Sequence, residues 1–465
     1  MSKTSYAYEK RNAEKRPVMD VFAIPPPPAF PDGGFQAWGT VLGSFLIMFC
    51  GFGYSSSFGV YQDLYVREYL SHSSPSAISW IGSVNIFIIL AGGFITGRLH
   101  DRGYFYPLIY VGSFLVALSL FMLSLAQPNQ LYQILLAQGI ANGVGAGMTY
   151  IPCIAIVSQH FSPKRRALAM TIIASGSSLG AVVHPIMLNN LLPRLGFGNT
   201  VRASAGLVSG LLTIACCLVR TRLPPPKTSI NVRSLLLKIV KDGPYLAATL
   251  GLAIYTIGFY YPLFYLQLDA IQHGLDPTFA FYSLVIMNTS SFVGRLAPGF
   301  VAHRFAVQRM ITVFSACGAV LILCMIALQD EASVIVIGIL YGFFAGCIVT
   351  CMSPLLAVLT EDMSELGARL GISVAISGIG ILVGPPIDGV LLTEQFIWWR
   401  PALFSGLMAL TGFALFVVML TLPPASPKKV HARANMKITG KEVMVVNIEL
   451  AVVDDHEDMD RCEDV

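Results

Sequence analysis

Charge is scarce in this chain of 465 residues. Only 12% of the residues are Asp, Glu, Lys or Arg, whereas an average soluble protein carries about 25%. Apolar residues make up 55% of the chain. They form runs of about 20 residues, long enough for a helix to cross a hydrocarbon core about 30 Å thick. The composition therefore excludes a single soluble domain and predicts an integral membrane protein.

Several chemical motifs are also missing. The spacing of the nine cysteines fits neither a disulfide framework nor a zinc site. Cys347 and Cys351 lie one helical turn apart without a His or an acid beside them, so apolar packing is the better interpretation. No Gly-x-x-x-x-Gly-Lys-Ser/Thr loop is present, which argues against ATP-driven pumping. The eight histidines are scattered, so we expect no enzyme, cofactor, metal site or nucleic-acid partner.

The apolar runs predict an all-α membrane protein with twelve transmembrane helices in two pseudo-symmetric bundles of six. The expected spans are about 38–61, 78–97, 106–126, 131–157, 167–192 and 203–219 in the first group, and about 245–267, 279–300, 310–328, 333–359, 370–392 and 401–422 in the second. The expected domains are a disordered cytosolic tail (1–37), an N-terminal bundle (38–219), a cytosolic linker (220–243), a C-terminal bundle (244–422) and a cytosolic tail (423–465). The linker is either a short amphipathic helix on the membrane surface or a solvated connector.

The distribution of positive charge predicts the orientation. With both termini in the cytosol, most of the 30 Lys and Arg residues fall in cytosolic segments, as the positive-inside rule requires. The positive residues left outside are Arg67, Arg194, Arg202 and Arg400. The opposite orientation would invert this bias. No targeting motif is evident in the sequence. We nevertheless expect the protein to lie in the plasma membrane.

A polar turn separates two apolar runs at Gly97-Arg98-Leu99-His100-Asp101-Arg102-Gly103. Apart from the register of its final glycine, this pattern resembles the loop signature between the second and third helices of the major facilitator superfamily. We expect Gly97, Asp101 and Arg102 to form a gating loop on that basis. A weaker copy, Gly299-Phe300-Val301-Ala302-His303-Arg304, follows about two hundred residues later, as two related halves would require. The alternative is a generic basic turn at a membrane surface.

Glycines spaced by four occupy corresponding places in the two halves. Gly176-x-x-x-Gly180 lies in the fifth expected span, and Gly380-x-x-x-Gly384 followed by Pro385 lies in the eleventh. Because lipid supplies no hydrophobic driving force between helices, small residues at this spacing let helix backbones approach closely. We expect these residues to pack helices in a transporter built from two rocking bundles.

Arg295 is a fixed charge well inside an expected span. An arginine near a helix centre costs about 2.5 to 3.5 kcal/mol on insertion scales, so it needs an internal partner, a water-filled cavity or an anionic ligand. A substrate-binding or coupling role is one interpretation. The other is a structural arginine that snorkels toward the cytosolic face.

Other polar side chains inside the spans are weaker candidates for the substrate site. His184 and Asn142, like Asn85, are more often interhelical hydrogen-bonding residues than ligands. Tyr255 and Tyr261 belong to an aromatic cluster around a proline in the seventh span. Their hydroxyl groups suit a cavity for a planar substrate, although an aromatic belt and core explain such residues equally well.

Two further motifs narrow the resemblance. Asp32-Gly33-Gly34-Phe35 with Trp38, and Phe161 followed by Lys164-Arg165-Arg166-Ala167-Leu168-Ala169, resemble the two signatures of the monocarboxylate porter family. The second includes the cytosolic basic residues Lys164, Arg165 and Arg166, and has Thr171 where the family carries glycine. The stretch from Glu365 to Gly371 and Gly384-Pro385-Pro386 are similar to fungal members.

The resemblance implies that Arg295 corresponds to the arginine that binds the substrate carboxylate in animal members. Those members place an aspartate one turn earlier, where this chain has Ser291, and a lysine in the first helix, where it has Phe58. Simple proton–lactate symport is therefore in doubt. Asp63 and Asp388 are the remaining acids that could couple protons.

The sequence thus favours a monomeric alternating-access transporter in the lipid bilayer. Its expected cargo is a small organic acid or a larger secondary metabolite, and the missing charged pair favours export of the latter. Proton-coupled monocarboxylate uptake is the alternative. A nutrient sensor without transport would normally carry a long cytosolic domain, and the two tails here are short.

Overall fold

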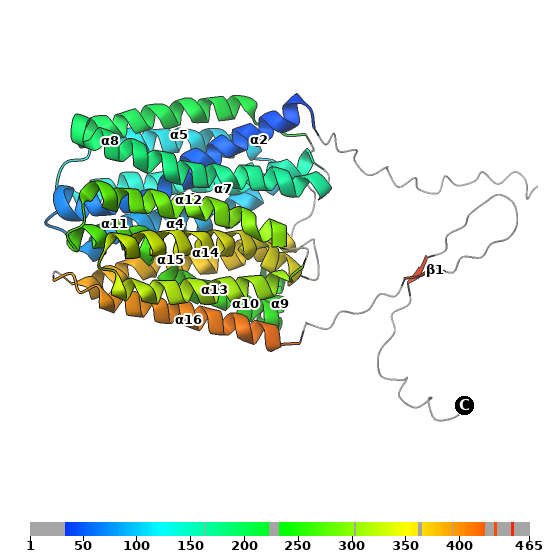
Figure 1. Ribbon diagram of the computed structural model, residues 1–465. Helices are drawn as coiled ribbons and strands as arrows, with labels where there is room; N and C mark the ends of the chain where they lie inside the picture. The colour runs from blue at the N-terminus through cyan, green and yellow to red at the C-terminus, as the bar shows by residue number, and fades with distance from the viewer. Residues whose placement is uncertain are drawn as a thin grey trace, which may run out of the picture.

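The chain folds into a layered bundle of long helices (Figure 1). The computed structural model describes residues 33–161, 163–222, 232–301, 304–360, 365–393 and 395–423, with the short segments 432–434 and 448–450. Nearly all of the expected N-terminal tail, part of the linker and most of the expected C-terminal tail lie outside the described residues. Two strands, β1 (Ala432–Ala434) and β2 (Ile448–Leu450), pair antiparallel beyond the last helix.

The N-terminal half contains these helices in chain order: α2 (Phe35–Met48), η1 (Phe49–Gly53), α3 (Phe58–Leu64), η2 (Tyr65–Tyr69), α4 (Pro75–Asp101), α5 (Phe105–Leu123), α6 (Leu131–Ile134), η3 (Leu135–Ala141), α7 (Asn142–Ala155), η4 (Ile156–Gln159) and α8 (Pro163–Leu218). Segments η1, η2 and η3 are π-helical, while η4 is a 3₁₀ turn. The first and fourth expected spans therefore both contain π-helical turns, and the first is also interrupted between η1 and α3.

The C-terminal half repeats this organisation: α9 (Val232–Lys241), α10 (Gly243–Phe259), α11 (Tyr261–Gln272), α12 (Pro277–Val301), α13 (Val307–Cys324), η5 (Met325–Ala327), α14 (Glu331–Val358), α15 (Leu366–Leu392) and α16 (Trp399–Thr421). Helix α9 occupies the expected linker. Its Leu236, Leu237 and Val240 are exposed and its Ile239 is buried.

The described residues form long helical segments at the places of the twelve expected spans. Ten helices are long and apolar enough to span a bilayer. One of these comprises two helices, because Gly196 interrupts α8 with a φ of 71°, a conformation that favours glycine. Helix α12 is more polar, yet it runs among the other long helices (Figure 1). Polar caps start several helices, such as the Ser74 hydroxyl, which accepts from the backbone N–H of Ala77 ahead of α4.

The predicted glycine pairs pack helices inside each bundle. A Cβ atom at Gly176 would lie 2.3 Å from the backbone oxygen of Phe45, and one at Gly180 would lie 2.4 Å from that of Phe49. In the C-terminal bundle, a Cβ at Gly384 would lie 2.0 Å from the backbone oxygen of Ile257. Helix α8 therefore touches α2 and η1 backbone to backbone, just as α15 touches α10. These contacts hold each bundle together and do not join one bundle to the other.

The two bundles meet along three helix pairs: α4 with α15, α8 with α12, and α3 with α11. Helix α2 begins and α16 ends at the same end of the molecule (Figure 1). The α3–α11 contact lies toward the opposite end, which we call the far end. There the rings of Phe58 and Phe264 lie 5.0 Å apart, and Gln267 Nε2 donates to Asp63 Oδ2 at 3.0 Å. Contacts between the bundles thus close the far end.

Candidate functional site

The first helix of each half is broken near its middle. Between η1 and α3, Ser57 has φ −84° and ψ 7°, and between α10 and α11, Tyr260 has φ −88° and ψ −5°. Pro262 follows the second break and cannot donate a backbone hydrogen bond. Discontinuous helices at matched positions are the usual site of substrate binding in transporters built from repeats.

A cavity lies where these two breaks face each other. Phe52 and Ser56 come from the first break, and Phe259, Tyr260 and Leu263 come from the second. Helices α12 and α14 supply the rest of the lining, which is Met287, Asn288, Ser291, Arg295, Tyr341, Gly342, Ala345 and Val349. The cavity volume is about 40 Å³, and one water molecule needs about 10 to 15 Å³ on this measure. In this conformation the cavity admits a few waters, so an organic substrate requires the bundles to separate.

Arg295 crosses from one bundle to the other at this cavity. Its Nη1 donates to Ser177 Oγ at 2.6 Å, and the backbone oxygen of Ala174 lies 3.4 Å away. Both partners belong to α8, in the N-terminal bundle. Arg295 Nε is buried and has no hydrogen-bond partner among the described residues. The guanidinium thus retains donor capacity without a neighbouring carboxylate, which suits an anionic ligand.

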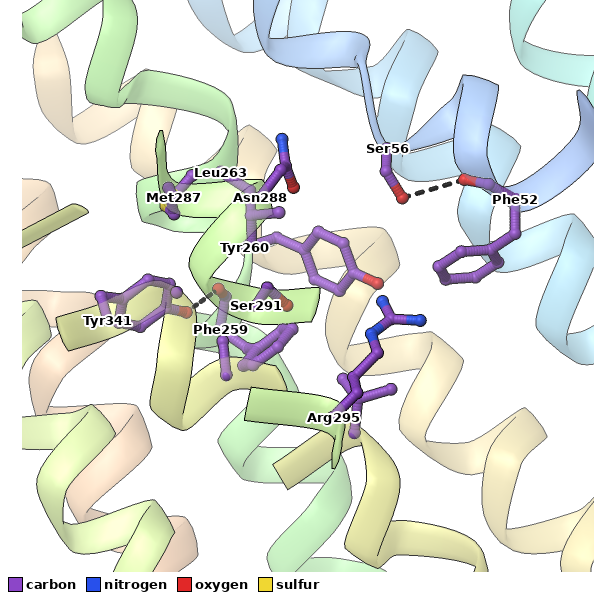
Figure 2. A pocket seen from close by; sticks show the side chains of 13 residues that line it. Phe52, Ser56, Phe259, Tyr260, Leu263, Met287, Asn288, Ser291, Arg295 and Tyr341 are labelled. Atoms are coloured by element: carbon purple, nitrogen blue, oxygen red, sulfur yellow. Dashed lines mark hydrogen bonds between the residues drawn. The ribbon is translucent and has the colours of Figure 1, made fainter. Parts of the chain in front are cut away.

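Aromatic side chains surround the guanidinium. Figure 2 shows the Tyr260 hydroxyl pointing toward Arg295, with Phe52 on the opposite side of the cavity. Tyr150 stacks on Phe52, with the ring centroids 5.7 Å apart. A cation framed by flat rings favours a planar or conjugated anion over a small, strongly hydrated one.

The remaining polar groups of the cavity are amide and hydroxyl groups. Asn288 Nδ2 is buried and makes no hydrogen bond to the described part of the chain. Ser291 lines the wall one turn before Arg295, at the position where the family resemblance places an aspartate. The Tyr341 hydroxyl donates to the backbone oxygen of Phe259, one of the groups exposed by the break in the helix (Figure 2). The cavity therefore offers one positive charge and neutral donors.

Four of the predicted site residues do not line this cavity. Tyr255 is buried beside Phe416 in the C-terminal bundle, and Tyr261 is buried on α11. His184 is buried in the N-terminal bundle, where its Nε2 lies 3.2 Å from the backbone oxygen of Phe49. Asn142 accepts from Asn85 Nδ2 at 3.1 Å and donates to Ser119 Oγ at 3.2 Å. Asn142 thus joins helices, which is the alternative that the sequence left open.

The predicted gating loop forms a tight turn between α4 and α5. Gly103 adopts a φ of 93°, Arg102 is exposed, and a Cβ at Gly97 would lie 3.5 Å from Ile151. The side chain of Asp101 lies outside the described residues, as do those of Lys164 and Arg166. Arg165 is exposed near the start of α8. The turn lies at the end of α4 away from Ser76, whose hydroxyl donates to the Pro386 backbone oxygen in the other bundle.

Phe52 and Asn288 line the cavity although neither was expected there from the sequence, and Tyr260, a member of the aromatic cluster around Pro262, was not singled out. Tyr260 and Tyr261 are adjacent, and which of them faces the cavity depends on where the helix breaks. Pro262 was the available signal, because proline marks the break. Reasoning also missed Asp269, a fully buried carboxyl group on α11.

Comparison with known proteins agrees with this architecture. The sequence matches the Major Facilitator Superfamily over residues 40–332 and 299–444. It is 38% identical over 387 residues to the Aspyridones efflux protein of Emericella nidulans, covering 83% of this chain and 78% of that protein. It is 36% identical over 390 residues to the Agnestins efflux protein of Paecilomyces divaricatus, covering 82% and 86%.

A solved structure of a mutant of the nucleoside transporter NupG superposes with a TM-score of 0.64, covering 83% of this chain and 99% of that one. The two share 12% sequence identity, so this likeness shows the fold alone. Together with the sequence matches, it means that this chain is a multi-pass integral membrane transporter and belongs to the Major Facilitator Superfamily.

Proposed function

We propose that the protein exports an anionic secondary metabolite by alternating access, in the manner of a fungal member of the monocarboxylate porter family. The observation that carries the proposal is Arg295, a charge at the interface of the two bundles. Within the described part of the chain, its guanidinium donates to the neutral groups of Ala174 and Ser177. An anion entering the cavity would replace Ser177 as the partner of the guanidinium. Binding would thereby release a contact between the bundles and favour the next conformation.

The shape of the cavity supports a flat organic anion. Tyr260 and Phe52 frame the guanidinium, and Asn288 adds an unpaired amide donor. Relatives named as efflux proteins for aspyridones and for agnestins support export of a secondary metabolite. Phe58 and Ser291 replace the charged residues of the animal porters, which argues against simple lactate symport.

The cellular setting follows from the same proposal. The functional unit is a monomer in the plasma membrane, with both termini in the cytosol and the far end facing outward. Its domains are the two six-helix bundles 38–219 and 244–422, joined by the linker 220–243. In this orientation the closed α3–α11 contact is an outer gate, and the structure corresponds to a state that is closed toward the outside.

Transport by purified protein in liposomes tests the proposal. Flat aromatic acids and short monocarboxylates are offered separately, and uptake is followed by mass spectrometry. We expect saturable movement of an aromatic acid and a fall of about 10- to 100-fold in Arg295→Ala, because a hydrogen bond to a charged group contributes about 1.5 to 3 kcal/mol.

Arg202→Ala is the matched control, since Arg202 is exposed and bonds only to Asn199 among the described residues. It should transport at the wild-type rate. Movement of lactate or pyruvate that depends on Arg295 would instead establish a monocarboxylate symporter. Binding of an acid without any flux would indicate a sensor.

A further inference from the structure

Helix α9 carries an apolar face that the rest of the described chain leaves largely uncovered. It lies at the end of the molecule where α2 begins and α16 ends (Figure 1). Its Leu236, Leu237 and Val240 are 44%, 61% and 65% exposed. Their spacing places them on one side of the helix, whereas Ile239 packs into the C-terminal bundle. Helix α9 thus has two apolar sides, and the bundle covers one of them.

The backbone places this exposed face at the boundary of the membrane. Asp242, the residue between α9 and α10, has φ −90° and ψ 89°, which is not a helical conformation. Its side chain accepts from the backbone N–H of Tyr245 at 3.2 Å and caps α10. The chain therefore turns at Asp242, and α9 does not continue along the helix from Gly243 to Gln272, which is long and apolar enough to cross the membrane. A helix in this position lies beside the lipid headgroups.

Positive charge borders the exposed face. Lys241 is exposed and follows Leu237 by four residues, so the two lie on the same side of the helix. The side chain of Lys238 is 59% exposed. The ten residues of α9 also include Arg233 and contain no acid. Apolar side chains flanked by lysines suit an anionic bilayer surface, because the apolar groups enter the boundary of the acyl chains while the ammonium groups bind phosphates.

Lys238 joins α9 to a helix at the interface of the two bundles. Its Nζ lies 2.5 Å from an Oε1 atom of Glu365, the residue before α15. Glu365 Oε2 lies 3.5 Å from Arg369 Nε, and Arg369 Nη1 lies 2.8 Å from Asp242 Oδ2. These ion pairs connect α9, the start of α10 and the first turn of α15. Because α15 packs against α4 of the other bundle, the position of α9 bears on the contact between the bundles.

We propose that α9 docks on the headgroup region of the adjacent leaflet and binds anionic phospholipids there. Leu236, Leu237 and Val240 enter the lipid, and Lys241 binds the phosphates. Through Lys238 and its ion pair, the docked helix holds the start of α15 at the membrane surface. This role goes beyond the proposed function, because it does not depend on which cargo is transported. In the orientation proposed above, the leaflet is the cytosolic one, which is rich in anionic lipids.

Fluorescence quenching of Leu237→Trp in nanodiscs tests the docking without any substrate. The emission of the full-length variant minus that of wild type gives the signal of the new indole. We expect brominated acyl chains to quench this signal strongly and acrylamide in the water to quench it weakly. Quenching by acrylamide alone would show a solvated connector. Quenching by neither would show that another part of the protein covers the face, and either result would overturn the proposal.

Energy transfer to labelled lipids tests the preference for negative charge. Transfer from the Leu237→Trp indole to a trace of dansyl-phosphatidylserine should exceed transfer to dansyl-phosphatidylcholine at the same concentration. Adding Lys241→Gln should lower this ratio by up to about fivefold, the contribution of one lysine near an anionic surface. Arg202→Gln, at an exposed arginine of the N-terminal bundle, is the matched control and should leave the ratio unchanged. Equal transfer to both lipids would overturn the binding of anionic lipid.

Lys238→Gln tests the connection to α15. It removes the ion pair to Glu365 and keeps the apolar face and Lys241, so lipid quenching of the indole should persist. With the aromatic acid that wild type moves, we expect transport by wild type to depend on the phosphatidylserine content of the liposomes and transport by Lys238→Gln not to. The same dependence in both proteins, or in neither, would refute the connection. Absence of transport in wild type would refute the proposed function and leave the docking result standing.

Discussion

The two bundles share a fold but differ in how they use polarity inside the membrane. In the N-terminal bundle, uncharged amides bond one helix to the next: Asn85 donates to Asn142, and Tyr65 donates to Gln138 Oε1 at 2.7 Å. Among its described residues, the buried acid is Asp63, which Arg67 binds through two nitrogens at 2.6 Å each. The C-terminal bundle instead buries Asp269 and Asp388 without a lysine or arginine partner in its described part.

This contrast suggests that the polar residues of the two bundles have different roles. Neutral amides inside a membrane contribute modestly to stability when they are paired. An ionisable side chain without a partner is unfavourable inside a membrane, and such residues usually mark the pathway of a substrate or an ion. The N-terminal bundle accordingly contributes Ser177 and Phe52 to the surroundings of Arg295, which belongs to the C-terminal bundle. Substitutions in matched places of the two bundles test this difference.

The largest effect is expected from breaking the buried ion pair of the C-terminal bundle. Arg369 Nη1 lies 2.8 Å from Asp242 Oδ2, and the two side chains are 6% and 9% exposed. Arg369→Met leaves Asp242 buried without this partner and should destabilise the protein by about 3 to 5 kcal/mol. Thermal unfolding in detergent measures the change. Arg202→Met in the N-terminal bundle should cost less than about 1 kcal/mol, and an equal loss in both would remove the contrast.

Glycine substitutions should affect both bundles alike. Gly180→Ala and Gly384→Ala force a Cβ against a backbone oxygen, at 2.4 Å and 2.0 Å respectively. Each should destabilise the protein by about 1 to 3 kcal/mol, as overpacking does. Gly206→Ala, where no atom lies within 4 Å of the added Cβ, is the control and should be neutral or slightly stabilising. Thermal unfolding followed by size-exclusion chromatography reports the change, and an effect confined to one bundle would contradict the symmetry of the glycine contacts.

The smallest effects are expected from replacing one asparagine in each bundle. Asn142→Ala removes interhelical hydrogen bonds and should lower stability by about 1 kcal/mol without altering transport specificity. Asn288→Ala removes a cavity amide whose Nδ2 is unpaired, so it should change substrate affinity and leave unfolding nearly unchanged. Unfolding temperature and apparent KM for the transported acid distinguish the two. A shift in KM for Asn142→Ala alone would reverse the assignment of scaffold and site.

The fold could be predicted from the sequence because each crossing is a long apolar run and because the glycine pairs recur at matched places. Arg295 was recognisable for the same reason, as a charge where charge is scarce. The direction in which each side chain points could not be predicted. Helices that are apolar on every side carry no polar face to orient them, so Tyr255 and Tyr261 were chosen although Tyr260 lines the cavity.

The burial of Asp269 could not be predicted for a related reason. Asp269 lies four residues before His273 and near the end of its span, where an acid usually reaches water. Its burial depends on how α11 packs against its neighbours, which no local pattern records. Asp388 was noted as an acid that could couple protons and Tyr261 as a cavity residue, but the complete burial of both depends on tertiary packing.

The placement of the glycine contacts has a consequence for how such a protein diversifies. Gly176 and Gly180 face the interior of one bundle, and Gly380 and Gly384 face the interior of the other. Most cavity residues lie on a different surface, between the bundles, whereas Gly342 also packs against Met287 inside the C-terminal bundle. Substitutions that reshape the cavity away from Gly342 therefore leave the packing of each bundle unchanged, and a duplicated gene can acquire a new cargo through a few mutations while remaining able to fold.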